Sequence, residues 1–264
     1  MTEKDANQVF TDETWALWEP LIEAVRPHGK TPPVDLRQTI AAIFWRHQNG
    51  AKWRSVPREL GPWWRAAQLF IRWAKQGVWE RLLELVQQHD LVLGMSFLDG
   101  TSIRAHHKAA GGAKKGGDSH ERDRREALGR SRGGYGTKAC VIADGRGRAI
   151  AFALAPGQAH ELPVAPGLLA RLPRAPKWVV GDKGYASDAF RARIWDMGAR
   201  PAIPPKRTDA PVACPPWIYA NRHLVENLWA RLKEWRAVAT RYEKTACSFL
   251  GVLCLAAVAD WIKP

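Results

Sequence analysis

Two aspartates stand at the ends of short apolar segments, where the chain could place them for catalysis. Asp99 closes the first in Phe97-Leu98-Asp99-Gly100-Thr101, and Asp182 closes the second in Val180-Gly181-Asp182-Lys183-Gly184-Tyr185. The carboxyl ends of sheet strands are where α/β folds form their sites, and a glycine beside each aspartate lets backbone or ligand approach closely. A single Asp-Gly at a strand end is usually only a turn, so this pair alone is a weak indicator of catalysis.

A third acid, Glu226, belongs to a polar stripe on a predicted helix over residues 219–236. At about 100° per residue, an apolar face typical of docking on a sheet falls on one side of that helix; its members are Leu224, Leu228, Leu232 and Trp235. On the opposite side lie Tyr219, Arg222, Glu226 and Lys233. A solvated face with an Arg222–Glu226 pair, worth roughly a few tenths of a kcal/mol, would explain two of these residues but not the whole stripe.

The chemistry that these residues predict is metal-assisted cleavage of a phosphodiester. Mg²⁺ prefers carboxylate and water oxygens, and two ions about 4 Å apart can serve both the attacking and the leaving oxygen. Three acids from two strands and a helix could hold such a pair. Arg222 and Lys233 would add positive charge toward the phosphates of DNA.

The elements that would position these groups alternate between strands and helices after residue 93. We predict strands over residues 95–99, 135–143, 148–155, 177–182 and 200–203, with a hairpin turn at Asp144-Gly145-Arg146-Gly147. Helices are predicted over residues 164–171, 187–197, 217–238 and 245–262, with Ser187 as a helix cap. Between the first two strands, residues 104–134 hold 9 basic and 4 acidic residues, and we expect a mobile loop there.

The segment before this alternation, residues 10–93, is predicted to be helical and contains eight of the 14 tryptophans. Asp35 begins a periodic segment that Asn49-Gly50 ends, and Gly61-Pro62 begins another. Core packing is the expected role of most of the rings, and one or two exposed ones could stack on bases. We therefore expect a small helical domain over residues 1–92 and a catalytic domain over residues 93–264.

Charge and composition narrow the class of protein. The 264 residues carry a net charge of +14 and 46% of them are hydrophobic, so the chain can bury a core and suits a polyanionic partner such as nucleic acid. Residues 1–92 hold 12 Lys and Arg against 11 Asp and Glu, whereas residues 93–264 hold 28 against 15. The longest apolar run is about half of a membrane span, the first residues do not resemble a signal peptide, and the four cysteines lack zinc-site spacing. We expect a reduced, cytoplasmic, soluble protein.

The spacing Tyr219-x2-Arg222-x3-Glu226-x6-Lys233 matches the Y-R-E-K signature of DDE transposases in the insertion-sequence four and five superfamily. With the two aspartate motifs, it makes residues 93–260 resemble a bacterial insertion-sequence transposase of the "five" family. Residues 10–85 resemble the small Trp-rich helical domain that precedes the catalytic domain in that family, which implies a role for residues 1–92 in binding DNA ends or in assembly. The four-residue signature is specific, and the aspartate motifs are moderately so.

The resemblance implies a fold, a set of catalytic residues and a reaction. The implied fold is ribonuclease H-like, an α/β (α+β) mixed sheet with flanking helices, preceded by the small all-α domain. Asp99, Asp182 and Glu226 would be the catalytic acids and the metal ligands, with Mg²⁺ as the ion and Mn²⁺ as a substitute. The implied reaction is hydrolytic nicking that frees a 3′-hydroxyl, followed by attack of that hydroxyl on target DNA, with no covalent protein–DNA intermediate.

The resemblance also implies a partner, which is double-stranded DNA as transposon terminal inverted repeats and as target. The side chains expected to contact it are Tyr219, Arg222 and Lys233 of the signature, together with the basic residues Arg236, Arg241, Lys114 and Lys115. Because two DNA ends must be held together, a homodimer is expected in the DNA complex. The expected location is the bacterial cytoplasm, in association with the nucleoid and with no membrane.

Some features fit the resemblance less closely, and other functions stay open. His160-Glu161 stands where related transposases tend to have His-Asp, so Glu161 is either the equivalent residue or a structural one. His106, His107 and His120 lack metal-site spacing, and Asp144, Asp188 and Glu234 are competing acids, the first two with ordinary turn and helix-start roles. The alternatives are a catalytically inactive transposase-derived DNA-binding protein, a metal-dependent DNA nuclease without strand transfer, and a structural RNA-binding protein.

Overall fold

A mixed β-sheet forms the centre of the computed structural model, which describes residues 9–28, 35–88, 90–110, 119–207 and 209–263. Its main strands are β1 (Met95–Ala105), β3 (Gly134–Ala143), β4 (Ala149–Pro156), β5 (Trp178–Gly181) and β6 (Arg200–Ala202). Two short strands, β2 (Gly129–Ser131) and β7 (Thr240–Arg241), pair with β3 and β1. All five strands expected from the sequence are present, but the first was predicted too short. β1 extends six residues beyond Asp99, so Asp99 lies inside the strand and not at its end.

The order and direction of the strands define the fold class. β3 pairs antiparallel with both β1 and β4, whereas β5 runs parallel to β1 and β6 runs parallel to β5. The main strands therefore lie in the order β4-β3-β1-β5-β6, with the first strand of the chain in the middle. This is the ribonuclease H-like arrangement, and the predicted fold class is confirmed.

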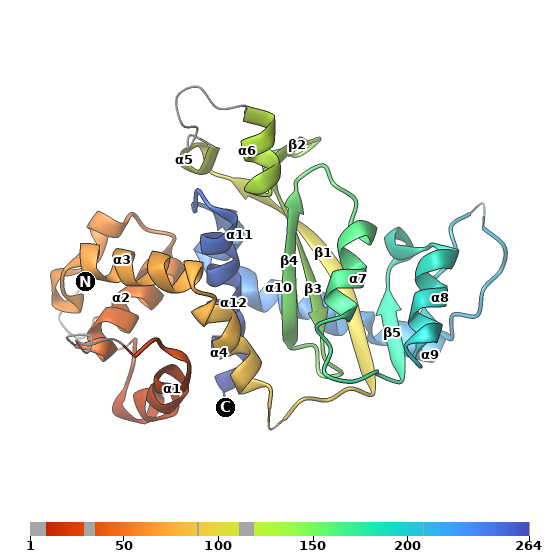
Figure 1. Ribbon diagram of the computed structural model, residues 1–264, viewed down its shortest axis with the longest axis horizontal. Helices are drawn as coiled ribbons and strands as arrows, with labels where there is room; N and C mark the ends of the chain where they lie inside the picture. The colour runs from red at the N-terminus through yellow and green to blue at the C-terminus, as the bar shows by residue number, and fades with distance from the viewer. Residues whose placement is uncertain (1–8, 29–34, 89, 111–118, 208, 264) are drawn as a thin grey trace.

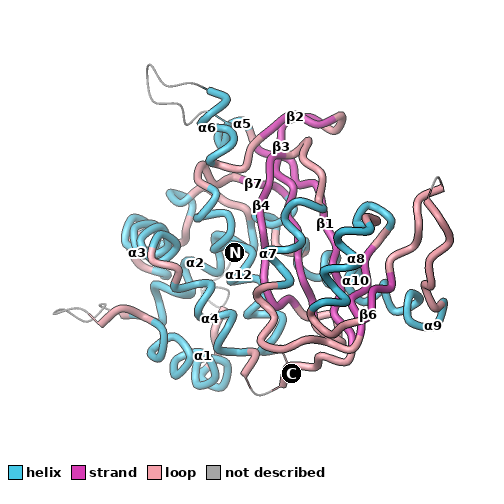
Figure 2. Tube along the Cα trace, turned by 45° about the vertical axis from the view of Figure 1, so that its right-hand side comes forward, coloured by secondary structure: helices cyan, strands magenta, loops and turns pink. Residues whose placement is uncertain are grey.

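Helices cover both faces of this sheet, as Figures 1 and 2 show. One layer contains α1 (Asp12–Val25), α2 (Leu36–Asn49), α3 (Trp63–Lys75), α4 (Val78–Val86), α10 (His223–Lys233), α11 (Arg236–Ala239) and α12 (Ala246–Ile262). The other layer contains α7 (Ala165–Leu169) and α8 (Asp188–Asp196), which pack on a second, smaller core. None of the helices in the described ranges is long and apolar enough to cross a membrane.

The N-terminal helices share one hydrophobic core with the helices that end the chain. Helix α12 packs against α3 and α4, and ten of its residues are buried. The contact is close, because a Cβ added to Gly251 of α12 would lie 2.7 Å from the Trp79 ring of α4. The predicted tryptophan packing is confirmed for Trp79 and most of its neighbours, while Trp64 remains 48% exposed.

Local sequence signals set several element ends as predicted. The Asp35 carboxylate accepts a hydrogen bond from the Gln38 N–H at the start of α2, and Gly50 ends that helix in the left-handed conformation. Ser187 stands at the N-cap of α8 but makes no side-chain cap hydrogen bond.

Two further predictions of local structure are wrong. The described parts of residues 104–134 are not one loop, because they contain α5 (His107–Ala110), α6 (Ser119–Arg125) and β2. The helix expected over residues 217–238 is divided into α9 (Pro216–Tyr219), a 3₁₀ turn over Ala220–Arg222, α10 and α11. Extended backbone at Trp235 separates α10 from α11, since its ψ of 114° cannot continue a helix.

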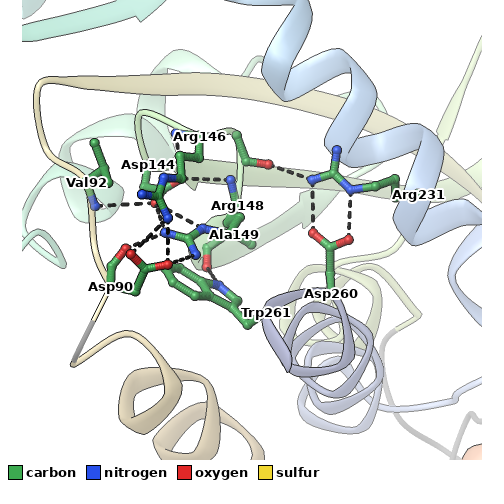
Figure 3. A network of polar contacts seen from close by, with 10 residues as sticks. Asp90, Val92, Asp144, Arg146, Arg148, Ala149, Arg231, Asp260 and Trp261 are labelled. Atoms are coloured by element: carbon green, nitrogen blue, oxygen red, sulfur yellow. Dashed lines mark hydrogen bonds and ion pairs between the residues drawn. The ribbon is translucent and has the colours of Figure 1, made fainter. Parts of the chain in front are cut away.

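The β3–β4 hairpin is anchored by a saturated polar network (Figure 3). The Asp144 carboxylate accepts hydrogen bonds from the backbone N–H groups of Arg146 and Arg148, each at 2.9 Å, and pairs with the Arg148 guanidinium at 2.8 Å. Arg148 also pairs with Asp90 and stacks on Trp261, with 3.7 Å between guanidinium and ring centroid. The turn role predicted for Asp144 is confirmed, and the network ties the hairpin to the linker before β1 and to α12.

Candidate active site

Asp99 lies in β1, the middle strand of the sheet, and is 8% exposed. The Arg222 guanidinium donates a hydrogen bond to Asp99 Oδ1 at 2.6 Å and also pairs with the Glu226 carboxylate. Arg222 ends the 3₁₀ turn that leads into α10, and Glu226 lies in the first turn of that helix. One arginine therefore brings together two of the three acids expected from the sequence.

Asp182 directly follows β5, the parallel neighbour of β1. In this pairing Gly181 lies beside Leu98, so Asp182, the first residue after β5, comes level with Asp99 inside β1. The Asp182 carboxylate caps the 3₁₀ turn Lys183–Tyr185 by accepting a hydrogen bond from the Gly184 N–H at 2.8 Å. The negative charge of Asp182 acts on Asp99, since it is one of the causes that raise the Asp99 pKa.

Helix α10 holds Glu226 in place through the apolar face that the sequence predicts. Leu228, Leu232 and Trp235 are buried, and Val225 and Trp229 add to the same core. Glu226 points away from this core, with a side chain that is 55% exposed. The strand and the helix are thus fixed by packing, while the carboxylate keeps access to solvent and substrate.

Arg222 does not fully offset the effects that raise the pKa of the Asp99 carboxyl group. Burial raises the pKa of Asp99, Arg222 lowers it, and the charges of Glu161 and Asp182 raise it again, with a net increase. Burial lowers the pKa of Arg222, but Asp99 and Glu226 together raise it above its ordinary value. The Arg222 Nε is buried and has no hydrogen-bond partner within the described part of the chain.

A second cation lies along the same strand. Lys233, at the end of α10, donates a hydrogen bond from Nζ to Thr101 Oγ1 at 2.7 Å. Burial lowers the Lys233 pKa, and Asp99 opposes this effect. Lys233 is therefore held near Asp99 by the side chain two residues further along β1.

The donor set fits a hard divalent cation, because Asp99, Asp182 and Glu226 supply carboxylate oxygens. Burial is the main cause of the raised pKa of Asp99, and Glu161 and Asp182 add to it, so a bound cation would lower that pKa. Within the described ranges, however, no three His, Cys, Asp or Glu side chains are grouped closely enough to hold a metal ion. The guanidinium of Arg222 supplies the positive charge between Asp99 and Glu226 instead.

The remaining candidate residues differ in their surroundings. Tyr219 is half-buried at the end of α9, and Arg236 is exposed at the start of α11. Lys114 and Lys115 lie outside the described residues. Arg241 is fully buried and donates hydrogen bonds to the Glu126 carbonyl and to the Thr137 hydroxyl, so the expectation that it contacts DNA is wrong.

Two further residues adjoin the site. The Lys138 ammonium of β3 pairs with the Glu161 carboxylate at 3.0 Å, and that carboxylate lies against Gly100. The sequence left the role of Glu161 open and did not single out Lys138. The alternation of β3 could place Lys138 on one face of the sheet, but no local signal joins it to a residue 23 positions later.

The comparisons with known proteins identify a family for this chain. Residues 10–83 match the family described as "Putative transposase of IS4/5 family", and residues 94–211 and 179–263 each match a family described as "Transposase DDE domain". An uncharacterized protein, y4sN of Sinorhizobium fredii, is 30% identical over 108 residues, which are 40% of this chain and 85% of that protein. A "Putative transposase for insertion sequence element IS6501" of Brucella ovis is 33% identical over 89 residues, 32% of this chain and 67% of its own length.

Among solved structures, a piggyBac transposase synaptic complex with hairpin DNA aligns with a TM-score of 0.45 and 12% identity. The alignment covers 96% of this chain and 72% of that one.

The family matches define the chain as a transposase with a DDE domain, an enzyme of the class that cuts DNA and depends on divalent metal ions. The chain belongs to the IS4/5 superfamily of insertion-sequence transposases, and the predicted resemblance is confirmed.

Proposed function

We propose that this transposase cleaves DNA at the ends of its insertion sequence and joins the freed 3′-hydroxyl to target DNA. Asp99, Asp182 and Glu226 are the catalytic acids in this proposal, and Mg²⁺ is the ion that they hold. The observation that carries the proposal is the single guanidinium of Arg222, which holds two of these acids while the third follows the neighbouring parallel strand.

Each side chain has a defined part in the proposed reaction. Asp99 on β1, Asp182 directly after β5 and Glu226 on α10 would supply the oxygen donors for a divalent ion. Such an ion would activate the attacking water or hydroxyl and would stabilise the charge that develops on the phosphate. Arg222 and Lys233 bring positive charge to the phosphate, with Lys233 oriented by Thr101.

Double-stranded DNA is the proposed partner, as terminal repeats and as target. The charge of residues 93–264, with 28 Lys and Arg against 15 Asp and Glu, supports this partner. Arg236 is exposed and beyond α10, so it can contact a phosphate outside the centre. We further propose a homodimer that holds two ends together, acting at the bacterial nucleoid.

The experiment that tests the function is a cleavage and strand-transfer assay on DNA carrying the element's own ends. Wild type is compared with Asp182→Asn in Mg²⁺, in Mn²⁺ and without divalent metal. Asp188→Asn is the matched control, because Asp188 is fully exposed and lies six residues further along the chain. Metal-dependent joined products from wild type and from Asp188→Asn, but not from Asp182→Asn, would support the proposal.

Two other results would point to the alternatives. Cleaved products without joined ones would identify a metal-dependent nuclease. Binding of the ends without cleavage by any variant would identify a DNA-binding relative that has lost its activity.

A further inference from the structure

The Glu161 carboxylate occupies space on β1 directly beside the first catalytic acid. Glu161 precedes the 3₁₀ turn Leu162–Val164, which leads into α7. A Cβ added to Gly100 would lie 2.5 Å from Glu161 Cδ and 2.7 Å from each carboxylate oxygen, closer than real Cβ atoms come. Since successive strand residues point to opposite faces, Glu161 supports β1 from the face opposite to the Asp99 side chain.

A lysine on the adjacent strand fixes this carboxylate. Lys138 Nζ lies 3.0 Å from Glu161 Oε1, and each side chain is only 18% exposed. Lys138 pairs in register with Ser102 of β1, so the ion pair joins β3 to the stretch of β1 that begins at Asp99. A partly buried pair of this kind constrains geometry more than an exposed one does.

The same carboxylate lies near the turn that carries Asp182. Tyr185 ends this turn and is fully buried. Burial raises the pKa of Tyr185, and Glu161 raises it further through its negative charge and through a side-chain hydrogen bond with Tyr185. The Tyr185 ring also packs on Gly181, since a Cβ there would lie 3.1 Å from it.

We propose that Glu161 is a positioning residue that fixes the separation between Asp99 and Asp182. It links β3 through Lys138, β1 at Gly100 and the Asp182 turn through Tyr185. The inference rests on the proposed function, because the separation matters only if these two acids act together on one ion. Residues that orient metal ligands in this way typically change metal affinity or activity about 10- to 100-fold when substituted.

The test compares Glu161→Gln with wild type in the cleavage assay, at several Mg²⁺ concentrations. A second readout is Mn²⁺ affinity, measured by electron paramagnetic resonance on the complex with end DNA. Asp260→Asn is the matched control: the Asp260 side chain is 7% exposed and is paired with Arg231 at 2.7 Å, but it lies on α12. Melting temperatures of all variants separate loss of fold from loss of positioning.

The expected result is a cleavage rate about 10- to 100-fold lower for Glu161→Gln, with Mn²⁺ affinity reduced to a similar extent. Asp260→Asn is expected to melt earlier and to keep the wild-type rate per folded molecule. Tyr185→Phe, which removes only one hydroxyl, should weaken Mn²⁺ binding less, and it decides the question if Glu161→Gln does not fold. Wild-type cleavage and wild-type Mn²⁺ affinity in Glu161→Gln would overturn the proposal.

A double variant excludes a purely structural ion pair. If Glu161 only neutralises Lys138, then Glu161→Gln combined with Lys138→Met should recover the wild-type rate, and such recovery would overturn the proposal. Continued loss of activity in the double variant supports positioning.

The same experiments distinguish failure of the proposed function from failure of the role proposed for Glu161. If wild type cleaves no DNA, the proposed function fails, and Mn²⁺ binding still decides the role of Glu161. Weaker binding in Glu161→Gln supports the role, whereas equal binding, or no binding to wild type, overturns it.

Discussion

Among the described residues, two clusters have one arginine that joins two acids, and the two differ in how their polar groups are paired. Arg222 joins Asp99 and Glu226 in the middle of β1, and Arg148 joins Asp144 and Asp90 at the β3–β4 hairpin (Figure 3). In each cluster the second acid is about half exposed, 55% for Glu226 and 53% for Asp90. Each cluster therefore has one arginine and two acids, and the exposure of the second acid does not distinguish them.

The number of hydrogen bonds that each cluster completes does distinguish them. Asp144 accepts from two backbone N–H groups as well as from Arg148, and Arg148 is stacked on Trp261. Asp99 has Arg222 as its hydrogen-bond donor, two further acids near it, and a raised pKa. A saturated cluster stabilises a fold, whereas an unsaturated one keeps capacity for a cation and a phosphate.

The largest expected effect comes from exchanging the buried acid of each cluster for its amide. We expect Asp99→Asn to lower DNA cleavage by more than about 100-fold, beyond the range for residues that only orient metal ligands. Its melting temperature should rise, because the folded state disfavours the charged form of Asp99. Asp144→Asn should lose about 3 kcal/mol of stability and keep its cleavage rate per folded molecule. Thermal melts and cleavage assays check both variants; a destabilised Asp99→Asn would refute the distinction.

The two arginines provide the next comparison. Removal of the guanidinium in Arg222→Met should raise the pKa of Asp99 further and shift the acid limb of the cleavage profile to higher pH. In Arg148→Met the profile should stay in place, while the lost ion pairs and ring contact reduce stability by about 2 kcal/mol. Cleavage rate against pH and urea unfolding measure these effects. An unshifted limb in Arg222→Met would show that Asp99 ionisation does not limit the reaction.

A third comparison is between Lys233 and Arg241, two cations that the sequence predicts to contact DNA. Lys233→Met should weaken DNA binding and reduce the slope of log affinity against log salt by about one. Arg241→Met should leave that slope unchanged and destabilise the protein, since Arg241 is buried among carbonyl and hydroxyl acceptors. Fluorescence anisotropy across a salt series tests both expectations. A reduced slope in Arg241→Met would restore its predicted contact with DNA.

The smallest expected effect concerns stability in acid. Hydrogen bonding to Arg148 lowers the pKa of Asp90, so its contribution to stability is present above the ordinary value of about 3.9 and is lost as pH falls through the folded value. Asp99 has the opposite sign, because its raised pKa makes stability fall as pH rises through the folded value. Asp90→Asn should therefore lose less stability on acidification than wild type does. Urea midpoints in acid and at neutral pH measure the difference, and an unchanged acid dependence would contradict it.

Much of the fold could be predicted from the sequence, because the signals involved are local. Strand and helix periodicity, the cap at Asp35 and the turn at Asp144 each depend on a few neighbouring residues. The helix over residues 217–238 was predicted too long, since the extended backbone at Trp235 is set by packing in the core. The structured parts of residues 104–134 were missed because charge and glycine content outweigh periodicity there.

The sequence by itself determined which groups could do chemistry: Asp99, Asp182 and the spacing from Tyr219 to Lys233 can be read directly from it. Only the tertiary structure decided which cations serve the site, because sheet register and helix docking set distances between residues far apart in the chain. Pairing of the strands buries Arg241 and places Lys138 where it forms an ion pair with Glu161. Docking of α10 on the sheet places Arg222 where it pairs with Asp99. Charge can be counted along a chain, but whether a charged group is saturated depends on what the fold packs around it.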